Sequence, residues 1–356
     1  MTELASTSTV AVLGAGNWGT TLAQRIALNG HRVLLWARDV AVRDAINERR
    51  FNDRFLPGVE LHPLVRAVTD PGAALANAGL VFIAIPSQAF RTVCREARSA
   101  FKPEHLVVHG TKGLEVESHR RMSEILIEET CVRQLGVLAG PNIAAEVARG
   151  LPCGTVVASP FPRVVERARR ALESREMRVF AGTDVLGVEL CGALKNVVAI
   201  AAGIADEMHI GENAKAFLVT RGMAELTRLA FTMGAEAATP TGLAGIGDLM
   251  VTCASPLSRN HRVGAALARG EELDDIVAQL GMVAEGVYAS IAARDLAERH
   301  GIEMPLFDRV DRVLHHGLSP ADALSELMTL TAGRDVARFA SLRRPPSIHP
   351  ALNRPR

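Results

Sequence analysis

One short segment constrains the fold of this chain more than any other. Gly14–Gly19, with the sequence Gly-Ala-Gly-Asn-Trp-Gly, stands between an apolar run at Thr9–Leu13 and an amphipathic stretch at Trp18–Asn29. Glycines at this spacing permit a tight turn, a close backbone approach and close packing of a helix on a strand. The segment therefore predicts a strand, a turn and a helix, which is the first unit of a parallel sheet covered by helices.

The same alternation continues through the first half of the chain and then stops. Further strands are expected at Arg32–Trp36, Val65–Thr69, Leu80–Ile85, Leu106–Val108, Gly136–Leu138, Gly154–Ser159 and Met177–Phe180, with helices at Val40–Arg50, Gln88–Ala100 and Arg163–Glu173. From about Gly182 only helical spacing remains, at Asp184–Ala205, Ala214–Met233, Arg259–Arg269, Glu285–His300 and Leu306–His315. We expect an α/β N-terminal domain over residues 1–182 with a doubly wound, mostly parallel sheet, and an all-α domain over 183–337.

Composition excludes several other classes of protein. Apolar residues make up 48% of the 356 residues and the net charge is +1, as in ordinary globular proteins without an excess charge for nucleic acid. The longest apolar run, near Val197–Ala205, is less than half of the roughly 20 residues of a membrane span, and Met1–Thr9 lacks the pattern of a signal peptide. Residues 338–356, rich in arginine and proline, are predicted to be a disordered tail.

The cysteines and histidines predict neither disulfides nor a metal site. The five cysteines are far apart and form no C-x-x-C pair, and the eleven histidines show no metal-ligand spacing. A reduced, cytoplasmic protein fits this pattern better than a disulfide framework.

The glycine turn points to a dinucleotide cofactor, because the N-terminus of the following helix faces phosphate groups. The next predicted strand ends at Trp36 and is followed by Arg38 and Asp39. A carboxylate here holds the ribose 2′-hydroxyl of NAD, whereas an arginine accommodates the 2′-phosphate of NADP. Arg38 comes first, which favours NADP and leaves NAD open. Alternatively, Arg38 is a solvated surface residue and Asp39 caps the next helix.

Lysine is scarce in this chain, with only Lys102, Lys112, Lys195 and Lys215 among forty basic residues. Lys195 lies in the middle of a predicted helix, with small and apolar neighbours on nearly every side. Burial lowers the pKa of a lysine, so Lys195 is a candidate general acid/base near neutral pH. In the alternative, its side chain reaches water from the edge of the helix.

Four more segments carry candidate site residues. Lys112 stands between two glycines after a predicted strand, and the loop with Gly140 and Asn142 follows another strand, so both fall on the ligand-binding edge of the sheet. Asp248 ends a glycine-rich turn, where it is either a functional acid or a helix cap. The segment Ser258–Arg262 begins a helix and suits a phosphate or carboxylate, or else forms a solvated basic face.

Together these motifs resemble the bacterial NAD(P)-dependent glycerol-3-phosphate dehydrogenases over roughly residues 8–335. The resemblance rests on seven segments in the order of the family: GAGNWGTTLA (14–23), TKGLE (111–115), AGPNIAAE (139–146), GALKNVVAIAAGI (192–204), GLAGIGDL (242–249), SRN (258–260) and VAEG (283–286). It implies a Rossmann domain followed by a helical domain, a homodimer, and reduction of dihydroxyacetone phosphate to sn-glycerol 3-phosphate, the backbone of glycerophospholipids.

The resemblance also implies roles for individual residues. Lys195 matches the catalytic acid/base, and Lys112 and Asp248 match residues that bind substrate and order the charges around it. Further substrate contacts are implied at Gly140, Asn142, Ser258, Arg259 and Asn260. Cofactor contacts are implied at Gly14, Gly16, Asn17, Trp18, Gly19, Arg38, Lys112, Ala144, Arg259, Val283 and Glu285.

The sequence departs from the family pattern in places, and two other functions stay open. Asn142 replaces a common threonine, and Glu207 and His209 stand where many members have glycine, which leaves the rate and substrate affinity open. The alternatives are a related two-domain reductase of a keto or hydroxy acid, and a dinucleotide sensor without turnover. Lys112, Lys195 and Asp248 speak against the sensor, because cofactor binding alone needs none of them.

Overall fold

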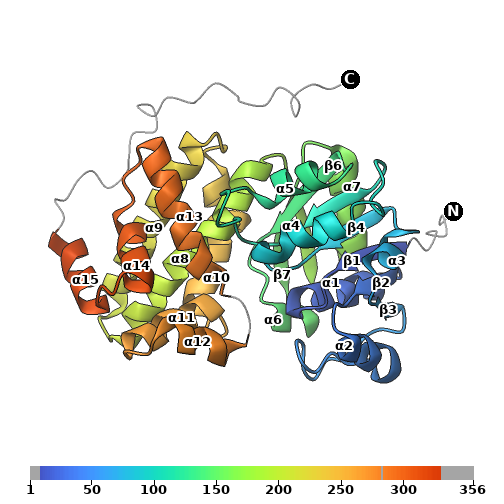
Figure 1. The fold of residues 1–356 in the computed structure, drawn as a ribbon, viewed down its shortest axis with the longest axis horizontal. Helices are drawn as coiled ribbons and strands as arrows, with labels where there is room; N and C mark the ends of the chain where they lie inside the picture. Colours follow the sequence, from blue (N-terminus) through green and yellow to red (C-terminus); the bar gives the residue numbers. More distant parts are fainter. Residues whose placement is uncertain (1–8, 282–283, 330–356) are drawn as a thin grey trace. The chain divides into compact units, whose positions relative to one another are not determined.

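The computed structural model describes residues 9–281 and 284–329, which divide into two compact units (Figure 1). The first unit consists of the described part of Met1–Thr111 together with Met122–Val185. The second consists of Lys112–Arg121 and the described residues from Leu186 onward. The predicted division after residue 182 stays a prediction, and the expected tail at 338–356 lies outside the described residues.

The first unit is built on one sheet. Its strands, in sheet order, are β3 (Val65–Val68), β2 (Arg32–Trp36), β1 (Thr9–Leu13), β4 (Leu80–Ile83), β5 (Leu106–His109), β6 (Gln134–Ala139), β7 (Cys153–Ala158) and β8 (Met177–Gly182). Neighbouring strands run parallel, except that β6 and β7 run antiparallel. The chain crosses over between β3 and β4, so that β1 lies beside β4 and the carboxyl ends of both strands meet at one edge.

Helices cover both faces of this sheet. They are α1 (Asn17–Leu28), α2 (Val40–Asp44), α3 (Pro71–Leu75), α4 (Ser87–Glu96), α5 (Met122–Glu129), α6 (Ala144–Ala148) and α7 (Pro162–Leu172), and a π-helical turn at Ala45–Arg49 follows α2. Alternate residues of β1 point to opposite faces. Val10 and Val12 join one hydrophobic cluster with α1 and α7, whereas Ala11 and Leu13 join another with α3, α4 and α5. The predicted doubly wound α/β fold is confirmed.

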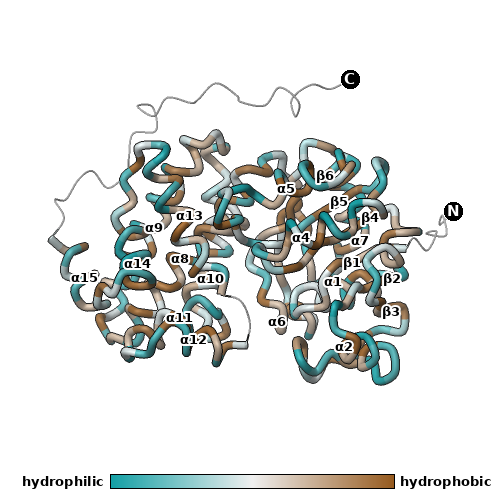
Figure 2. Tube along the Cα trace, in the orientation of Figure 1, coloured by the Kyte–Doolittle hydropathy of each residue, from teal (hydrophilic) through white to brown (hydrophobic). Residues whose placement is uncertain are grey.

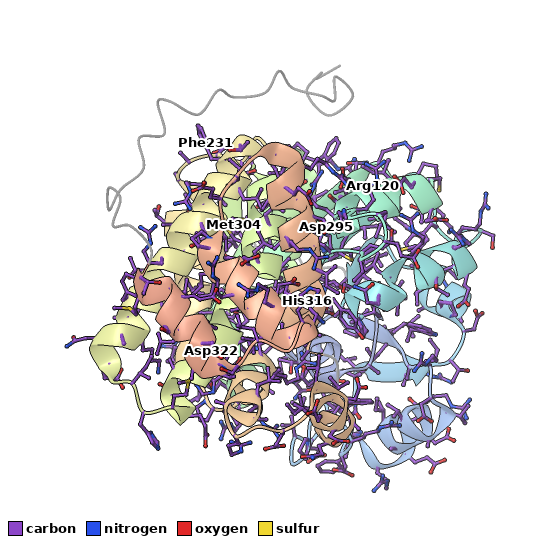
Figure 3. All side chains as sticks on the ribbon, turned by 60° about the vertical axis from the view of Figure 1, so that its left-hand side comes forward. Arg120, Phe231, Asp295, Met304, His316 and Asp322 are labelled. Carbon is purple, nitrogen blue, oxygen red and sulfur yellow. The ribbon has the colours of Figure 1, made fainter. Side chains whose placement is uncertain are left out.

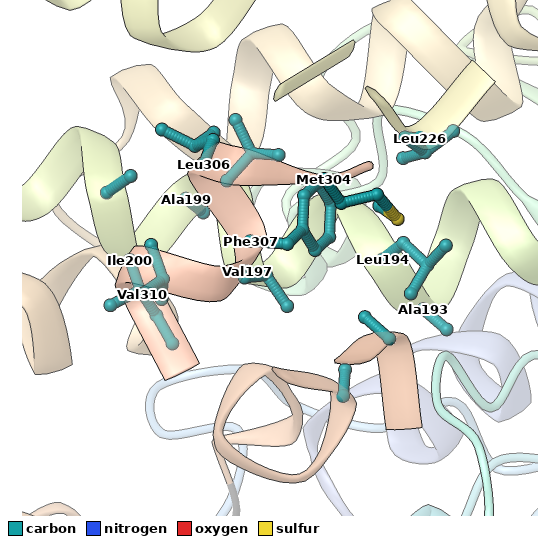
Figure 4. Close-up of a cluster of buried hydrophobic side chains, with 14 of the residues drawn as sticks. Ala193, Leu194, Val197, Ala199, Ile200, Leu226, Met304, Leu306, Phe307 and Val310 are labelled. Carbon is teal, nitrogen blue, oxygen red and sulfur yellow. The ribbon is translucent and has the colours of Figure 1, made fainter. Parts of the chain in front are cut away.

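Apart from Lys112–Arg121, the second unit is built of helices where the structure describes it. Its helices are α8 (Val185–Glu207), α9 (Glu212–Thr232), α10 (Asp248–Ala254), α11 (Arg259–Ala268), α12 (Leu273–Leu280), α13 (Glu285–His300), α14 (Pro305–His315) and α15 (Pro320–Thr329), with a 3₁₀ turn at Thr239–Thr241 and a π-helical turn at Leu243–Gly247. Its hydrophobic core surrounds α8. Met304, labelled in Figure 3, precedes α14, and Figure 4 shows Phe307 of α14 beside Val197 of α8.

The central helix α8 is buried along most of its length, and hydrophobic stretches of its trace are brown in Figure 2. By length and composition it is the one described helix that could cross a membrane, but 89% of its most apolar window is buried inside the protein. A core helix passes the same test, so α8 is weak evidence for a membrane span.

Small residues let other helices approach α8 closely. A Cβ at Gly203 of α8 would lie 2.0 Å from the carbonyl oxygen of His261, and a Cβ at Gly264 would lie 2.0 Å from that of Ile200. Only glycine at both positions permits this crossing of α8 and α11. The crossing places the start of α11 beside the middle of α8, where Lys195 lies.

Candidate functional site

The glycine turn after β1 has the geometry that a pyrophosphate needs. Gly14 has a φ of +113°, and a Cβ there would lie 2.4 Å from the carbonyl oxygen of Ala84. A Cβ at Gly19 would lie 1.8 Å from the carbonyl oxygen of Gly14, so glycine is required for the helix to pack on the turn. Nothing lies within 4 Å of a Cβ built on Gly16, and no side chain caps the start of α1 there. The first amides of α1 and the space beside Gly16 therefore fit the phosphates of a dinucleotide.

Trp18, on the first turn of α1, lies against the carboxyl end of β5. A Cβ at Gly110 would lie 2.8 Å from the indole Nε1 of Trp18, so the glycine makes room for this ring. The Nε1 atom is buried and has no hydrogen-bond partner among the described residues. Asn17, beside Trp18, is half-buried at the start of the same helix. The structure thus places both predicted cofactor residues at the carboxyl edge of the sheet.

Asp39, which follows the end of β2, is bonded by other parts of the protein. One oxygen of Asp39 accepts a hydrogen bond from the Ala41 amide at 2.9 Å, so the side chain caps α2. The other oxygen pairs with Arg54 at 2.8 Å. Arg38, next to it, is exposed. The carboxylate is therefore already engaged by protein donors, while the Arg38 side chain faces water.

The loop after β6 is a second predicted site segment of the first unit, the sheet unit. Gly140 has a φ of +146°, and a Cβ there would lie 2.9 Å from the carbonyl oxygen of Gly154. Asn142 donates from Nδ2 to the Thr155 hydroxyl at 2.9 Å, and its buried Oδ1 has no partner among the described residues. The carbonyl oxygen of Ala144, which begins α6, accepts a hydrogen bond from Thr21 of α1 at 3.3 Å. Of the predicted positions 140, 142 and 144, Ala144 thus connects directly to the helix that follows the glycine turn, and the other two lie against β7.

In the helical unit, one buried carboxylate joins two lysines. Asp248 lies 3.1 Å from the Lys195 Nζ through Oδ1, and 2.5 Å from the Lys112 Nζ through Oδ2. Lys195 is 4% exposed and Asp248 is 2% exposed. Burial lowers the pKa of Lys195 to about 8, assisted by the charge of Lys112 and opposed by Asp248. This arrangement is what a group that exchanges a proton near neutral pH requires.

Two residues around this cluster were not predicted from the sequence. Lys195 Nζ donates to the Thr252 hydroxyl at 2.5 Å, and that hydroxyl donates to the Asp248 carbonyl oxygen one helical turn back at 2.6 Å. Asn196, next to Lys195 on α8, accepts from Asn260 at 2.9 Å. Thr252 could have been found from the sequence, because it stands four residues after Asp248 on the same helix, α10, and therefore on the same face.

The start of α11 supplies the predicted anion-binding residues. Ser258 caps the helix by accepting from the His261 amide at 3.3 Å. Burial lowers the pKa of the Arg259 guanidinium, and the carboxylate of Glu285 opposes that shift. The side chain of Asn260 is bonded by protein groups at both ends, because its Oδ1 also accepts from the Gly286 amide at 2.9 Å. Asn260 therefore fastens α11 to α8 and α13.

Comparison with known proteins identifies the family. Two family models match, the N-terminus of NAD-dependent glycerol-3-phosphate dehydrogenase over residues 9–164 and its C-terminus over residues 184–325. The chain is 45% identical to glycerol-3-phosphate dehydrogenase (NAD(P)+) of Anaeromyxobacter dehalogenans, over 89% of this chain and 96% of that protein. It is 44% identical to the enzyme of that name from Streptomyces avermitilis, over 90% and 96% of the two chains.

The chain belongs to the NAD-dependent glycerol-3-phosphate dehydrogenase family. The crystal structure of glycerol-3-phosphate dehydrogenase from Coxiella burnetii is similar to this fold, with a TM-score of 0.87 and 37% identity over 91% of this chain and 99% of that one. The predicted family, and with it the oxidoreductase class and the use of NAD(P), is confirmed.

The residues implied by the family resemblance fall into two groups. The sheet unit holds Gly14, Gly16, Asn17, Trp18, Gly19, Arg38, Gly140, Asn142 and Ala144. The helical unit holds Lys112, Lys195, Asp248, Ser258, Arg259, Asn260 and Glu285. Val283 lies outside the described residues. Within the helical unit, the structure brings Lys112, Lys195 and Asp248 into direct contact.

The two departures from the family glycines have visible consequences. Glu207, the last residue of α8, pairs with Arg269 at 3.0 Å. His209 has a φ of +53°, a left-handed conformation that glycine adopts without strain and histidine does not. Glu207 ends α8 and His209 lies in the connection to α9, and neither contacts the lysine cluster through a described hydrogen bond.

Proposed function

We propose that this protein reduces dihydroxyacetone phosphate to sn-glycerol 3-phosphate, reversibly, with NAD(P)H as the reductant. The observation that carries the proposal is the buried Lys195 ammonium, held 3.1 Å from Asp248, in a member of the glycerol-3-phosphate dehydrogenase family. Reduction of a ketone needs a hydride at the carbonyl carbon and a proton at the carbonyl oxygen. When bound, the reduced nicotinamide supplies the hydride.

Lys195 supplies the proton in this account. With its pKa lowered to about 8, about nine-tenths of the side chain is protonated at pH 7, and the ammonium is a stronger acid than an ordinary lysine. The Nζ atom transfers a proton to the carbonyl oxygen as negative charge develops there, and regains a proton afterwards. In the reverse direction, the neutral amine accepts the proton of the secondary hydroxyl.

Asp248 and Thr252 hold the Lys195 ammonium in one position. The amine nitrogen has three hydrogens, of which one points to Asp248 Oδ1 and one to the Thr252 hydroxyl. The third is left for the substrate oxygen. Lys112, on the other oxygen of Asp248, keeps the net charge of the cluster positive, which favours a dianionic phosphorylated substrate.

We assign the substrate phosphate to Arg259 and the beginning of α11. A guanidinium binds phosphate through paired donors, and the first amides of a helix attract an anion. Arg259 is the first residue of this ten-residue helix. Asn260 contributes mainly by holding α11 in place, because both ends of its amide bond protein groups. Contacts of Gly140 and Asn142 with the substrate, and of Glu285 with the cofactor, remain part of the proposal.

We propose that NADPH is preferred to NADH. Asp39, the residue whose carboxylate would hold a ribose 2′-hydroxyl, is already bonded to the Ala41 amide and to Arg54. Arg54 pairs with Asp39, and Arg38 is the exposed residue just before it in the sequence, so two arginines are available here to suit a 2′-phosphate.

Three further properties belong to the same proposal and follow the family resemblance. The product is the backbone of glycerophospholipids, so we propose a role in their synthesis. The five free cysteines support a reducing compartment, the cytoplasm. We expect a homodimer, which sedimentation equilibrium would distinguish from a monomer.

An absorbance assay at 340 nm on the purified protein tests the proposal. We expect oxidation of NADPH, and more slowly of NADH, on addition of dihydroxyacetone phosphate. A protein that binds cofactor but oxidises it only with a keto acid would be the alternative two-domain reductase. Cofactor binding without turnover on either substrate class would identify a sensor and contradict the proposal.

A further inference from the structure

We propose that the segment Lys112–Arg121 is a clasp that fixes the Lys112 ammonium to the helical unit, with Arg121 and Glu189 as positioning residues for the reaction. This inference rests on the proposed function, because it explains how Lys112 is held where that reaction needs it. Arg121 and Glu189 touch neither Lys195 nor Asp248 in any described contact, and they act through Lys112.

The clasp lies between β5 and α5 in the sequence, yet it groups with the helical unit. Its two ends pair as an antiparallel bridge between Leu114 and Arg121. The Glu115 amide donates to the Arg120 carbonyl oxygen at 3.0 Å, and the His119 amide donates to the Glu115 carbonyl oxygen at 2.8 Å. Leu114 is 1% exposed and packs in the core around α8. The segment is therefore a folded hairpin anchored on helices.

One ion pair and one contact between a histidine and a carboxylate fasten the hairpin to these helices. Arg121 Nη1 lies 2.6 Å from Glu189 Oε2 on α8, and the two side chains are only 13% and 2% exposed. His119 Nε2 lies 3.1 Å from Asp295 Oδ2 on α13. Figure 3 labels Arg120, the neighbour of His119 in the clasp, and Asp295 of α13, which His119 contacts.

One face of α8 receives the whole clasp. Glu189, Gly192 and Asn196 follow one another at helical spacing of three and four residues, so they share this face. Glu189 binds Arg121 at the far end of the clasp, and Asn196 Nδ2 donates to the Lys112 carbonyl oxygen at 3.4 Å at its near end. A Cβ at Gly192 would lie 3.5 Å from the Cγ of Lys112, so the lysine stem runs along the helix at the glycine.

The ion pair between Arg121 and Glu189 is better suited to fixing the position of the clasp than to stabilising the fold. A buried ion pair contributes little net stability, because both charges lose their hydration, but it accepts only a narrow geometry. Here that geometry sets where the clasp leaves α8, at Glu189, six residues before Lys195 on the same helix. Lys112 then meets Asp248 at 2.5 Å. A displacement of about 1 Å at a reacting group can cost roughly 10²-fold in rate.

The test is a kinetic double-mutant cycle with Lys112. Glu189→Gln and the double variant Arg121→Met/Glu189→Leu are made in the wild type and in a Lys112→Met background, and kcat and KM for dihydroxyacetone phosphate are measured with NADPH. The double variant replaces the pair by apolar groups of similar volume, which keeps the fold if the single variant is unstable. We expect a loss of roughly 10-fold to 10²-fold in kcat/KM in the wild type. In the Lys112→Met background we expect less than about twofold further loss.

A matched control and a second measurement separate positioning from general damage. Glu225→Gln changes another buried glutamate of the helical unit, on α9, and should leave kcat/KM within about twofold. Amide hydrogen exchange at Glu115 and His119, whose amides close the hairpin, should accelerate at least about tenfold in Glu189→Gln.

Equal losses in both backgrounds, or unchanged exchange at the two hairpin amides, would overturn the inference. If the wild type does not reduce dihydroxyacetone phosphate, the proposed function fails. The exchange measurement still decides then whether Arg121 and Glu189 hold the clasp, since it does not depend on turnover.

Discussion

Replacement of Asp248 by asparagine should move the pH profile of the reaction. Asp248 Oδ1 lies 3.1 Å from the Lys195 Nζ, and its charge raises the pKa of that lysine against the effect of burial. At an effective dielectric constant of 20, a unit charge pair at this distance is worth about 5 kcal/mol. That energy corresponds to roughly 4 pKa units. Relaxation of the side chains and entry of water absorb part of it, so we expect the pKa of Lys195 to fall by about 2 units in Asp248→Asn.

The assay is kcat for reduction of dihydroxyacetone phosphate as a function of pH. Reduction needs protonated Lys195, so the rate falls as pH rises through its pKa, which is about 8 in the wild type. The alkaline limb of Asp248→Asn should lie near pH 6 instead. Asp206→Asn is the matched control, because Asp206 also binds a lysine and a histidine, Lys215 and His261, both at 2.7 Å, but makes no described contact with Lys195. A limb that stays near pH 8 in Asp248→Asn would refute the coupling between the two groups.

Three other substitutions test separate parts of the account. Arg38→Ala should raise KM for NADPH about tenfold while KM for NADH stays within about twofold, measured in the same assay, because one guanidinium contact to a 2′-phosphate is worth about 1.5–3 kcal/mol. Glu225, which accepts the Leu306 and Phe307 amides at the start of α14, has its pKa raised by burial from 4.5 to about 7. The stability that protonated Glu225 contributes is present below pH 4.5 and is lost as pH rises through 7. Glutamine does not titrate, so the free energy of unfolding of Glu225→Gln, measured in urea, should rise relative to that of the wild type by up to about 3 kcal/mol between pH 4.5 and 8. His209→Gly should stabilise the protein by about 0.5–1 kcal/mol, seen as a higher Tm, because it removes a left-handed histidine at φ +53°; an unchanged or lower Tm would show that the strain is offset locally.

Much of the sheet unit could be predicted from the sequence because its signals are local. The apolar runs gave β1 and β2 with their observed ends, and the glycine spacing gave the turn between β1 and α1. The sequence did not predict that β7 runs antiparallel to β6, because an apolar run does not show in which direction its strand runs in the sheet. The predicted helix at Val40–Arg50 ends as a π-helical turn with Arg50 at φ +60°, which periodicity alone does not distinguish from a regular helix.

The residues of the candidate site could be predicted from their types and positions in the sequence, but the contacts between them could not. A rare lysine on an apolar helix of an arginine-rich chain is enough to predict that Lys195 is a buried base, and the side chain is indeed buried. Its bond to Thr252 depends on where α10 lies against α8, and the attachment of Lys112–Arg121 to the helical unit depends on Glu189, 68 residues from Arg121. Such long-range contacts follow from tertiary packing, which the local spacing of residues in the sequence does not predict.

Turnover by Lys195→Met tests the central claim most directly. The methionine side chain fills nearly the volume of the lysine stem but has no proton to give, so the fold and the glycine turn of the sheet unit should be unaffected. We predict that kcat for dihydroxyacetone phosphate falls by at least about 10²-fold while the Kd for NADPH, from fluorescence titration, stays within about twofold. Near-normal turnover in Lys195→Met would contradict the assignment of this lysine as the proton donor.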